Sequence, residues 1–346
     1  MPHESPKTDH PRAPSQTRPD DRENTMTRTR LLAALLTAAT LIGTAQAQDF
    51  PRTTIQLINP YAAGGSADLL ARTVAMAMAE RLGKEVIVVN KPGAGTTIGA
   101  SFVAHAEPDG HTLYLSTATA HAIMPRLSKT AYDGIADFAP IAMLANVPNV
   151  LVVRSSLPVK TVPELIAYAK AHPNALNFAS VGIGSQPHLA AELFMQTTGT
   201  RMVHVPYTGV APATTDLVSG QMDLGFLNAP PLLQHIESGA LRALAVTIPK
   251  RADLLPDVPT LDELGLAGFD IGTWYGLSAP AKTPGPVLDK LRRTLAAVMS
   301  DRAVRGKIVS QGSEVFYLDG DAFAAYLKRD AERMARLIDT AGIKTR

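Results

Sequence analysis

The fold is decided by the stretch Asn59-Pro60-Tyr61-Ala62-Ala63-Gly64-Gly65-Ser66-Ala67-Asp68. A β-branched run at 53–58 precedes this loop, and a helical pattern at 69–82 follows it. The order strand, small-residue loop, helix presents backbone N–H groups at a helix N-terminus, where an anion is favoured. The loop contains no Lys, Arg, His or Cys. The stretch therefore predicts a loop that holds an anionic ligand without transforming it.

The same alternation of strand and helix continues along the chain. Strands are predicted at 53–58, 86–90, 112–116, 150–154, 176–179, 202–205, 222–226 and 242–247. Helices are predicted at 69–82, 97–105, 163–172, 189–198, 212–219, 231–238, 286–299, 303–310 and 321–341. Thr161 and Glu164 have the spacing of a capping box at the start of one helix. This alternation predicts an α/β fold with parallel sheets.

Two segments have the character of crossings between lobes. Asn146-Val147-Pro148-Asn149 precedes a new alternating block, and Gly272-Thr273-Trp274-Tyr275-Gly276 closes it. We therefore predict one lobe from 48–148 plus 272–346, and a second lobe from 149–271. Two crossings form a hinge, and hinged lobes close around ligands.

The N-terminal segment differs from the rest. Residues 1–25 are rich in proline and charge, and we interpret them as disordered or as sequence upstream of a true start at Met26. Arginines, an apolar run at 31–42 and Ala45-Gln46-Ala47 follow. This is the pattern of a signal peptide, and the run is short for a membrane span. We predict export, with 1–47 as upstream segment and signal peptide and a mature chain starting near Gln48.

Composition excludes several function classes. The chain of 346 residues has 33 Lys and Arg against 31 Asp and Glu, a net charge of +2, without a basic stripe for nucleic acid. It has no cysteine, which excludes thiol catalysis, thiolate metal sites and iron–sulfur clusters. A chain of this length can bury a core that is stable without disulfides.

The loops that follow the predicted strands are the candidate site, because ligands of open α/β sheets bind beyond the carboxyl ends of the strands. These loops are rich in Gly, Ser, Thr and Asn, and they lie at 60–68, 91–97, 116–121, 180–188, 206–212 and 227–230. Turns use the same residue types, so a single loop is weak evidence. Their number in both halves favours a site between the lobes. Lys91 is their one cation, which suits a carboxylate better than a phosphate ester.

Individual loop residues leave alternatives open. Ser66 is a candidate N-cap, and Asp68 is placed to pair with Arg72 at i,i+4, so Asp68 either stabilises the helix or contacts ligand. Ser185 and His188 lack a G-x-S-x-G context and an orienting acid, which favours Ser185 as a cap or ligand donor. Tyr207 is either a wall of the ligand site or a packed loop aromatic. The histidines lack metal-binding spacing.

Taken together, the loops resemble the periplasmic solute-binding receptors of tripartite tricarboxylate transporters, the Bug-type receptors. The resemblance covers essentially the whole mature chain. It rests on the ordered set Pro60–Asp68 with Arg72, Asn90–Gly95, Pro108–Leu113, Ser180–Ser185 with His188-Leu189, Val205–Gly209 and Gly220–Asp223. It implies a two-lobed Venus-flytrap (type II) periplasmic-binding-protein fold with two crossing strands, which captures a small organic carboxylate and delivers it to an inner-membrane permease.

The resemblance also implies a set of ligand contacts. First-lobe contacts would be Tyr61, Ala62, Gly64, Ser66, Asp68, Thr117 and Ala118, and second-lobe contacts would be Gly184, Ser185, Tyr207 and Asn228. Some positions depart from the common pattern: Met124 stands where Asn is usual, Thr208 where Lys is frequent, and Thr96-Thr97 where Gly-Asn is usual. The lost polarity suggests an apolar or aromatic carboxylate.

We therefore predict a periplasmic, monomeric receptor with no cofactor, metal, catalytic residue or nucleic-acid partner. One alternative is a carboxylate sensor that acts with a membrane histidine kinase. The other is an enzyme on the same scaffold, since fold does not fix function. Porphobilinogen deaminase has a related core but needs a cysteine, which this chain lacks.

Overall fold

The computed structural model describes residue 3 and residues 50–341. The predicted signal peptide and its cleavage site lie outside the described residues, as does the upstream segment 1–25 apart from residue 3. The chain divides into Met1–Asp49 and Phe50–Arg346, and the fold given below is that of the second unit. Within the described residues, none of the helices has both the length and the apolar character that a membrane span requires.

The first sheet of this unit contains six strands in the order β11-β4-β10-β3-β1-β2 among the described residues. Strand β1 pairs in parallel with both β2 and β3, whereas β10 runs antiparallel to β3 and β4, and β11 runs antiparallel to β4. The strands are β1 (Ile55–Asn59), β2 (Val86–Asn90), β3 (Thr112–Ser116), β4 (Phe138–Val147), β10 (Thr273–Pro280) and β11 (Glu314–Leu318).

The second sheet has the order β7-β6-β8-β5-β9. Here β6 pairs in parallel with β7 and β8, and β5 runs antiparallel to β8 and β9. Both sheets are therefore mixed, and the prediction of parallel sheets is correct only for the strands that lead into the glycine-rich loops. The strands are β5 (Asn149–Arg154), β6 (Asn177–Ser180), β7 (Val203–Pro206), β8 (Leu224–Asn228) and β9 (Leu241–Val246).

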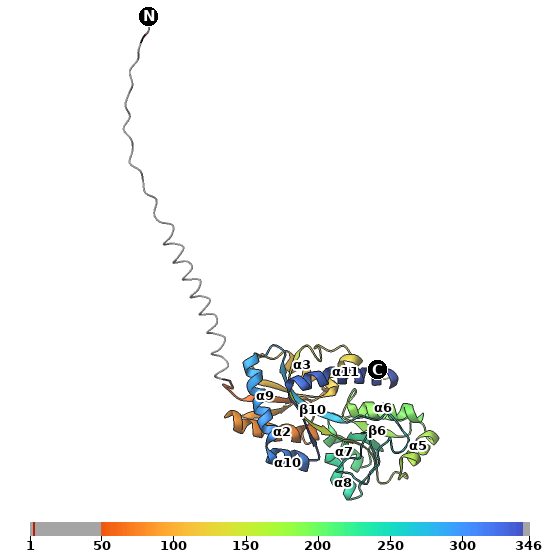
Figure 1. Cartoon of the computed structure of the whole chain (residues 1–346). Helices are drawn as coiled ribbons and strands as arrows, with labels where there is room; N and C mark the ends of the chain where they lie inside the picture. The colour runs from red at the N-terminus through yellow and green to blue at the C-terminus, as the bar shows by residue number, and fades with distance from the viewer. Residues whose placement is uncertain (1–2, 4–49, 342–346) are drawn as a thin grey trace. The chain divides into compact units, whose positions relative to one another are not determined.

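Helices cover both sheets (Figure 1). Beside the first sheet, α2 (Ser66–Leu82), α9 (Gly285–Ser300) and α10 (Arg302–Ser310) pack against one another. Other elements that follow first-sheet strands are η1 (Ala94–Thr96), α3 (Thr97–Ala104), η2 (Thr119–Ile123), α4 (Met124–Leu127) and α11 (Gly320–Ala341). The second sheet is accompanied by α5 (Val162–Ala171), α6 (Gln186–Thr198), α7 (Val210–Val218), η3 (Pro230–Leu232) and α8 (Leu233–Glu237).

The chain passes between the sheets twice. β4 continues through Pro148 into β5, and the segment after β9 leads back into β10. One apolar cluster contains Leu57 and Leu113 from the first sheet together with Val150 and Val152 from the second. Burial of this shared apolar surface favours the association of the two halves. The lobe boundaries at 148/149 and 271/272 stay a prediction.

Candidate functional site

The predicted site residues follow the carboxyl ends of parallel strands in both sheets. Tyr61 and Ser66 follow β1, and Thr117 follows the neighbouring strand β3. In the second sheet, Ser185 follows β6, while Asn228 ends β8, which pairs with β6. Neighbouring parallel strands bring their ends to one edge of a sheet, so each half gathers its predicted residues at one edge.

The two groups of loops contact each other directly. The Ala62 N–H donates to the Thr208 carbonyl oxygen at 3.0 Å. A Cβ atom built on Gly95 would lie 2.5 Å from the Ile183 carbonyl oxygen, so only glycine fits there. A Cβ atom on Gly184 would likewise lie 2.5 Å from Met124 Sδ. The loops that follow the strands of the first sheet therefore contact those of the second sheet at these positions.

Asp68 ties the first loop to its surroundings. Arg72 donates to both of its carboxylate oxygens at 3.0 Å, the Gly64 N–H donates at 3.1 Å, and Asn90 Nδ2 donates at 3.1 Å. Burial alone would raise the pKa of Asp68, but these hydrogen bonds and the Arg72 charge outweigh it and lower that pKa. The predicted pair with Arg72 is confirmed. Both carboxylate oxygens are engaged, so Asp68 shapes the loop.

Ser66 differs from its predicted capping role. The N-cap of α2 is Gly65, which provides no side-chain cap, and Ser66 is the first helical residue. The chain enters the helix one residue earlier than the propensity of serine for N-caps suggests. The Ser66 hydroxyl is buried and has no hydrogen-bond partner in the part of the chain that the structure describes.

Thr117, which follows the neighbouring strand β3, also has a buried hydroxyl. Its hydroxyl is fully buried and forms no well-aligned hydrogen bond among residues 50–341. It lies near the buried Tyr61 hydroxyl, whose pKa is raised by burial and partly lowered by Thr119 and Thr117. An unpaired buried hydroxyl costs about 1–3 kcal/mol, and a bound ligand can remove that cost. Asn59 Nδ2 is likewise buried without a hydrogen bond among the described residues.

Ser185 has the capping role that its sequence favoured. It is the N-cap of α6, and its Oγ accepts the His188 N–H at 3.2 Å. The residue as a whole is 1% exposed. Because it accepts the helix N–H, its own proton remains available to donate to an anion.

The side chains of Tyr207 and Asn228 form hydrogen bonds with other residues of the protein. The Tyr207 hydroxyl donates to Asp216 Oδ2 at 2.6 Å, and burial together with Asp216 raises the pKa of Tyr207 to about 12. Asn228 is buried, donates to Asn149 Oδ1 at 2.7 Å and accepts from the Tyr275 hydroxyl at 3.3 Å. These side chains form walls whose polar atoms point to protein partners.

A polar cluster at the crossings was not predicted from sequence. Asn149 donates to the Ile271 carbonyl oxygen at 2.9 Å and accepts from Thr273 Oγ1 at 3.0 Å, besides its bond from Asn228. The first residue of β5 is thus bonded to the other crossing. The sequence marked both crossings, but spacing alone does not reveal which side chains join them.

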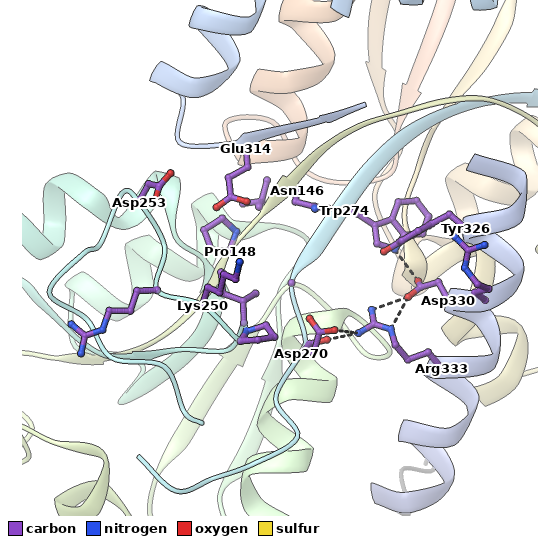
Figure 2. Close-up of a pocket in the computed structure, with 16 residues that line it drawn as sticks. Asn146, Pro148, Lys250, Asp253, Asp270, Trp274, Glu314, Tyr326, Asp330 and Arg333 are labelled. Carbon is purple, nitrogen blue, oxygen red and sulfur yellow. Dashed lines mark hydrogen bonds and ion pairs between the residues drawn. The ribbon is translucent and has the colours of Figure 1, made fainter. Parts of the chain in front are cut away.

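One cavity of about 710 Å³ lies beside the crossings and not at the predicted site residues (Figure 2). On one side, Arg333 of α11 donates to buried Asp330 at 2.8 Å and pairs with Asp270, which precedes β10, at 3.2 Å. Trp274 Nε1 donates to Asp330 at 2.8 Å. This network links α11 to the second crossing. Among the described residues, no group of three or more His, Asp or Glu side chains is placed to hold a metal ion.

Residues 70–343 match the model of the tripartite tricarboxylate transporter family receptor. The chain belongs to this receptor family. Its members are binding proteins, and this chain is accordingly a binding protein and not an enzyme. BugD, a periplasmic binding protein, superposes with a TM-score of 0.82 at 36% identity, covering 86% of this chain and 100% of BugD. The fold is therefore the two-lobed α/β fold of periplasmic binding proteins.

Two further relatives were solved with bound carboxylates. R. palustris Rpa4515 with adipate has a TM-score of 0.82 and 34% identity, covering 86% of this chain and 99% of that protein. MatC (Rpa3494) from Rhodopseudomonas palustris with bound malate has a TM-score of 0.80 and 32% identity, covering 84% of this chain and 100% of MatC.

Proposed function

We propose that this protein is an exported, monomeric periplasmic receptor that binds a small organic carboxylate between lobes 48–148 plus 272–346 and 149–271. It then delivers the ligand to an inner-membrane transporter of the tripartite tricarboxylate type. The buried Ser66 and Thr117 hydroxyls carry this proposal, because neither forms a well-aligned hydrogen bond among the described residues and they follow the neighbouring strands β1 and β3. The adipate and malate complexes of its relatives support a carboxylate.

The proposed mechanism is lobe closure. The ligand carboxylate accepts hydrogen bonds from Ser66 and Thr117 on one lobe and from Ser185 on the other, which favours the closed population. Contacts from Tyr61, Ala62, Gly64, Ala118 and Gly184 complete the site, and Asp68, Tyr207 and Asn228 shape its walls.

The ligand class follows from Met124. Its side chain is 7% exposed, and its sulfur lies against Gly184 of the other half and close to Gly95. A thioether donates no hydrogen bond, so the part of the ligand that reaches this side chain is best apolar. We propose a carboxylate with an apolar or aromatic portion.

Titration calorimetry tests this function. Purified protein is titrated with malate, citrate, adipate and benzoate. We expect saturable binding that is tightest for adipate or benzoate, and at least about tenfold weaker in Ser66→Ala and Ser185→Ala. Ser300→Ala, whose exposed hydroxyl donates to the Ala297 carbonyl oxygen, is the matched control with unchanged affinity. Tight binding confined to citrate would refute the apolar class, and no binding across a broad carboxylate panel would refute the function.

A further inference from the structure

We propose that His188 is a positioning residue that holds the 182–185 loop in the shape that meets the ligand. The inference rests on the proposed function, because it assigns that loop to the ligand site. The side chain of His188 is 7% exposed, so it acts through the residues that it contacts.

Two reciprocal hydrogen bonds join His188 to the loop. The Gly184 N–H donates to His188 Nδ1 at 3.2 Å, while the His188 N–H donates to Ser185 Oγ at 3.2 Å. This arrangement resembles a capping box, except that the side chain reaches one residue further back, to Gly184. The bonds fix the backbone of Gly184, whose φ is +74°, and the hydroxyl of Ser185 together.

The two bonds define the protonation state that His188 needs. A ring nitrogen that accepts an N–H carries no proton, so neutral His188 has its proton on Nε2. That nitrogen lies 3.3 Å from Glu192 Oε1, one helical turn later, so Glu192 can accept a hydrogen bond from the Nε2–H group. Neither ring nitrogen of His188 contacts Ser185 Oγ, so the pair is not arranged as a nucleophile and its base.

His204 clamps the other end of the loop. Its ring stacks on His188 with centroids 4.1 Å apart, and its Nε2 lies 2.7 Å from Ser180 Oγ. Ser180 Oγ in turn accepts the Gly182 N–H at 3.2 Å. Burial and the neighbouring His188 lower the pKa of His204 to about 3, so His204 is neutral at ordinary pH. The stacked pair thus joins both ends of the loop.

The position of this loop sets the fit of the two halves. Gly184 lies against Met124, and the Ile183 carbonyl oxygen lies where a side chain on Gly95 would stand. A small shift of 182–185 would therefore change both the direction of the Ser185 hydroxyl and the contact between the halves. This is why we assign His188 a role in binding beyond stabilising α6.

The test compares His188→Gln, which keeps an acceptor, with His188→Leu, which removes it. His235→Leu is the control, because the His235 side chain lies on α8 and forms no hydrogen bond or ion pair with the residues that the structure describes. Hydrogen exchange of ligand-free protein reports on the loop, and calorimetry with adipate and malate reports on affinity. We expect His188→Leu to speed exchange at 182–185 and weaken affinity roughly 5- to 20-fold, with recovery in His188→Gln.

The outcomes separate the two proposals. Unchanged loop exchange and affinity in folded His188→Leu would overturn the positioning role, as would a His188→Gln variant that behaves like His188→Leu. Wild-type protein that binds none of the carboxylates would refute the proposed function. The hydrogen-exchange data would still show whether His188 holds the 182–185 loop. If His188→Leu does not fold, ¹⁵N NMR spectra of the histidine side chains in the wild-type protein test the inference, because they show which ring nitrogen carries the proton. We predict an unprotonated Nδ1 at His188, and a protonated Nδ1 would overturn the inference.

Discussion

At the scale of single residues, the Asp68 carboxylate stabilises the conformation of the 60–68 loop that contains it. It is 4% exposed and is bonded to Arg72, Asn90 and the Gly64 N–H. The sequence predicted the Arg72 pair from its i,i+4 spacing. It could not predict Asn90 or Gly64, because those contacts depend on the pairing of β1 with β2 and on the turn of the loop.

Asp68→Asn should lower the free energy of unfolding by about 2 kcal/mol, because the buried carboxylate loses its charge-assisted hydrogen bonds. Urea unfolding at pH 7 measures this. Asp339→Asn is the matched control: Asp339 pairs with Arg126, and both side chains are more than half exposed, so its change should stay within about 0.5 kcal/mol. Equal effects of the two substitutions would refute the role of Asp68.

The buried His121 predicts a pH dependence of stability. Burial lowers the pKa of His121 to about 4, against about 6.5 in an unfolded chain. Between these values the unfolded chain binds more protons than the folded one, so unfolding free energy should fall as pH drops from 6.5 to 4. His121→Phe should remove up to about 3 kcal/mol of that fall. The exposed His172→Phe is the control, and an unchanged slope in His121→Phe would contradict the prediction.

At the scale of elements, the sequence predicted β2 and β3 at their observed bounds. It predicted the ends of the other strands that it identified, β1 and β5 to β9, within two residues. It missed β4, β10 and β11 as strands. The glycines of the segment 272–276 indicated a boundary between lobes and not a strand, yet β10 is buried throughout. A Cβ on Gly276 would lie 2.5 Å from Phe323 Cζ, so this glycine allows close packing of α11. That requirement comes from tertiary structure.

For the candidate site, too, the sequence predicted local features but not the contacts that depend on tertiary structure. The sequence placed its loops and named Ser185 as a cap, because both follow from local patterns. It took Ser66 for a cap, whereas Ser66 is the first residue of the helix, and it did not predict the hydrogen bond of Asn228 to Asn149 at the crossings. Which polar atoms find protein partners depends on strand pairing, which a single sequence does not contain.

The crossings yield a prediction at this scale. Asn149→Ala should lower the free energy of unfolding by about 2–3 kcal/mol, because the Ile271 carbonyl, Thr273 and Asn228 each lose a partner. The double variant with Asn228→Ala should cost less than the sum of the single variants by about 1 kcal/mol. Additive effects in urea unfolding would show that the two amides act independently.

At the scale of the whole molecule, the account depends on closure of the two halves. Gly95→Ala should block it, because the new Cβ meets the Ile183 carbonyl oxygen of the other half. Gly83→Ala is matched to it: Gly83 has φ +66° against +59° for Gly95, but its Cβ meets nothing within 4 Å. We expect both variants to lose similar stability from strain, about 1 kcal/mol, and only Gly95→Ala to lose carboxylate affinity, by calorimetry. Full affinity in Gly95→Ala would contradict closure at this contact.

The central claim is that a carboxylate brings the two halves together, and energy transfer between them tests it most directly. The chain has no cysteine, so Glu80→Cys on α2 and Glu237→Cys on α8, both at exposed positions, give two unique labelling sites. We predict that titration with adipate or malate changes the transfer efficiency saturably, and that Gly95→Ala abolishes the change. A transfer efficiency that stays constant while the carboxylate saturates the protein would contradict the account.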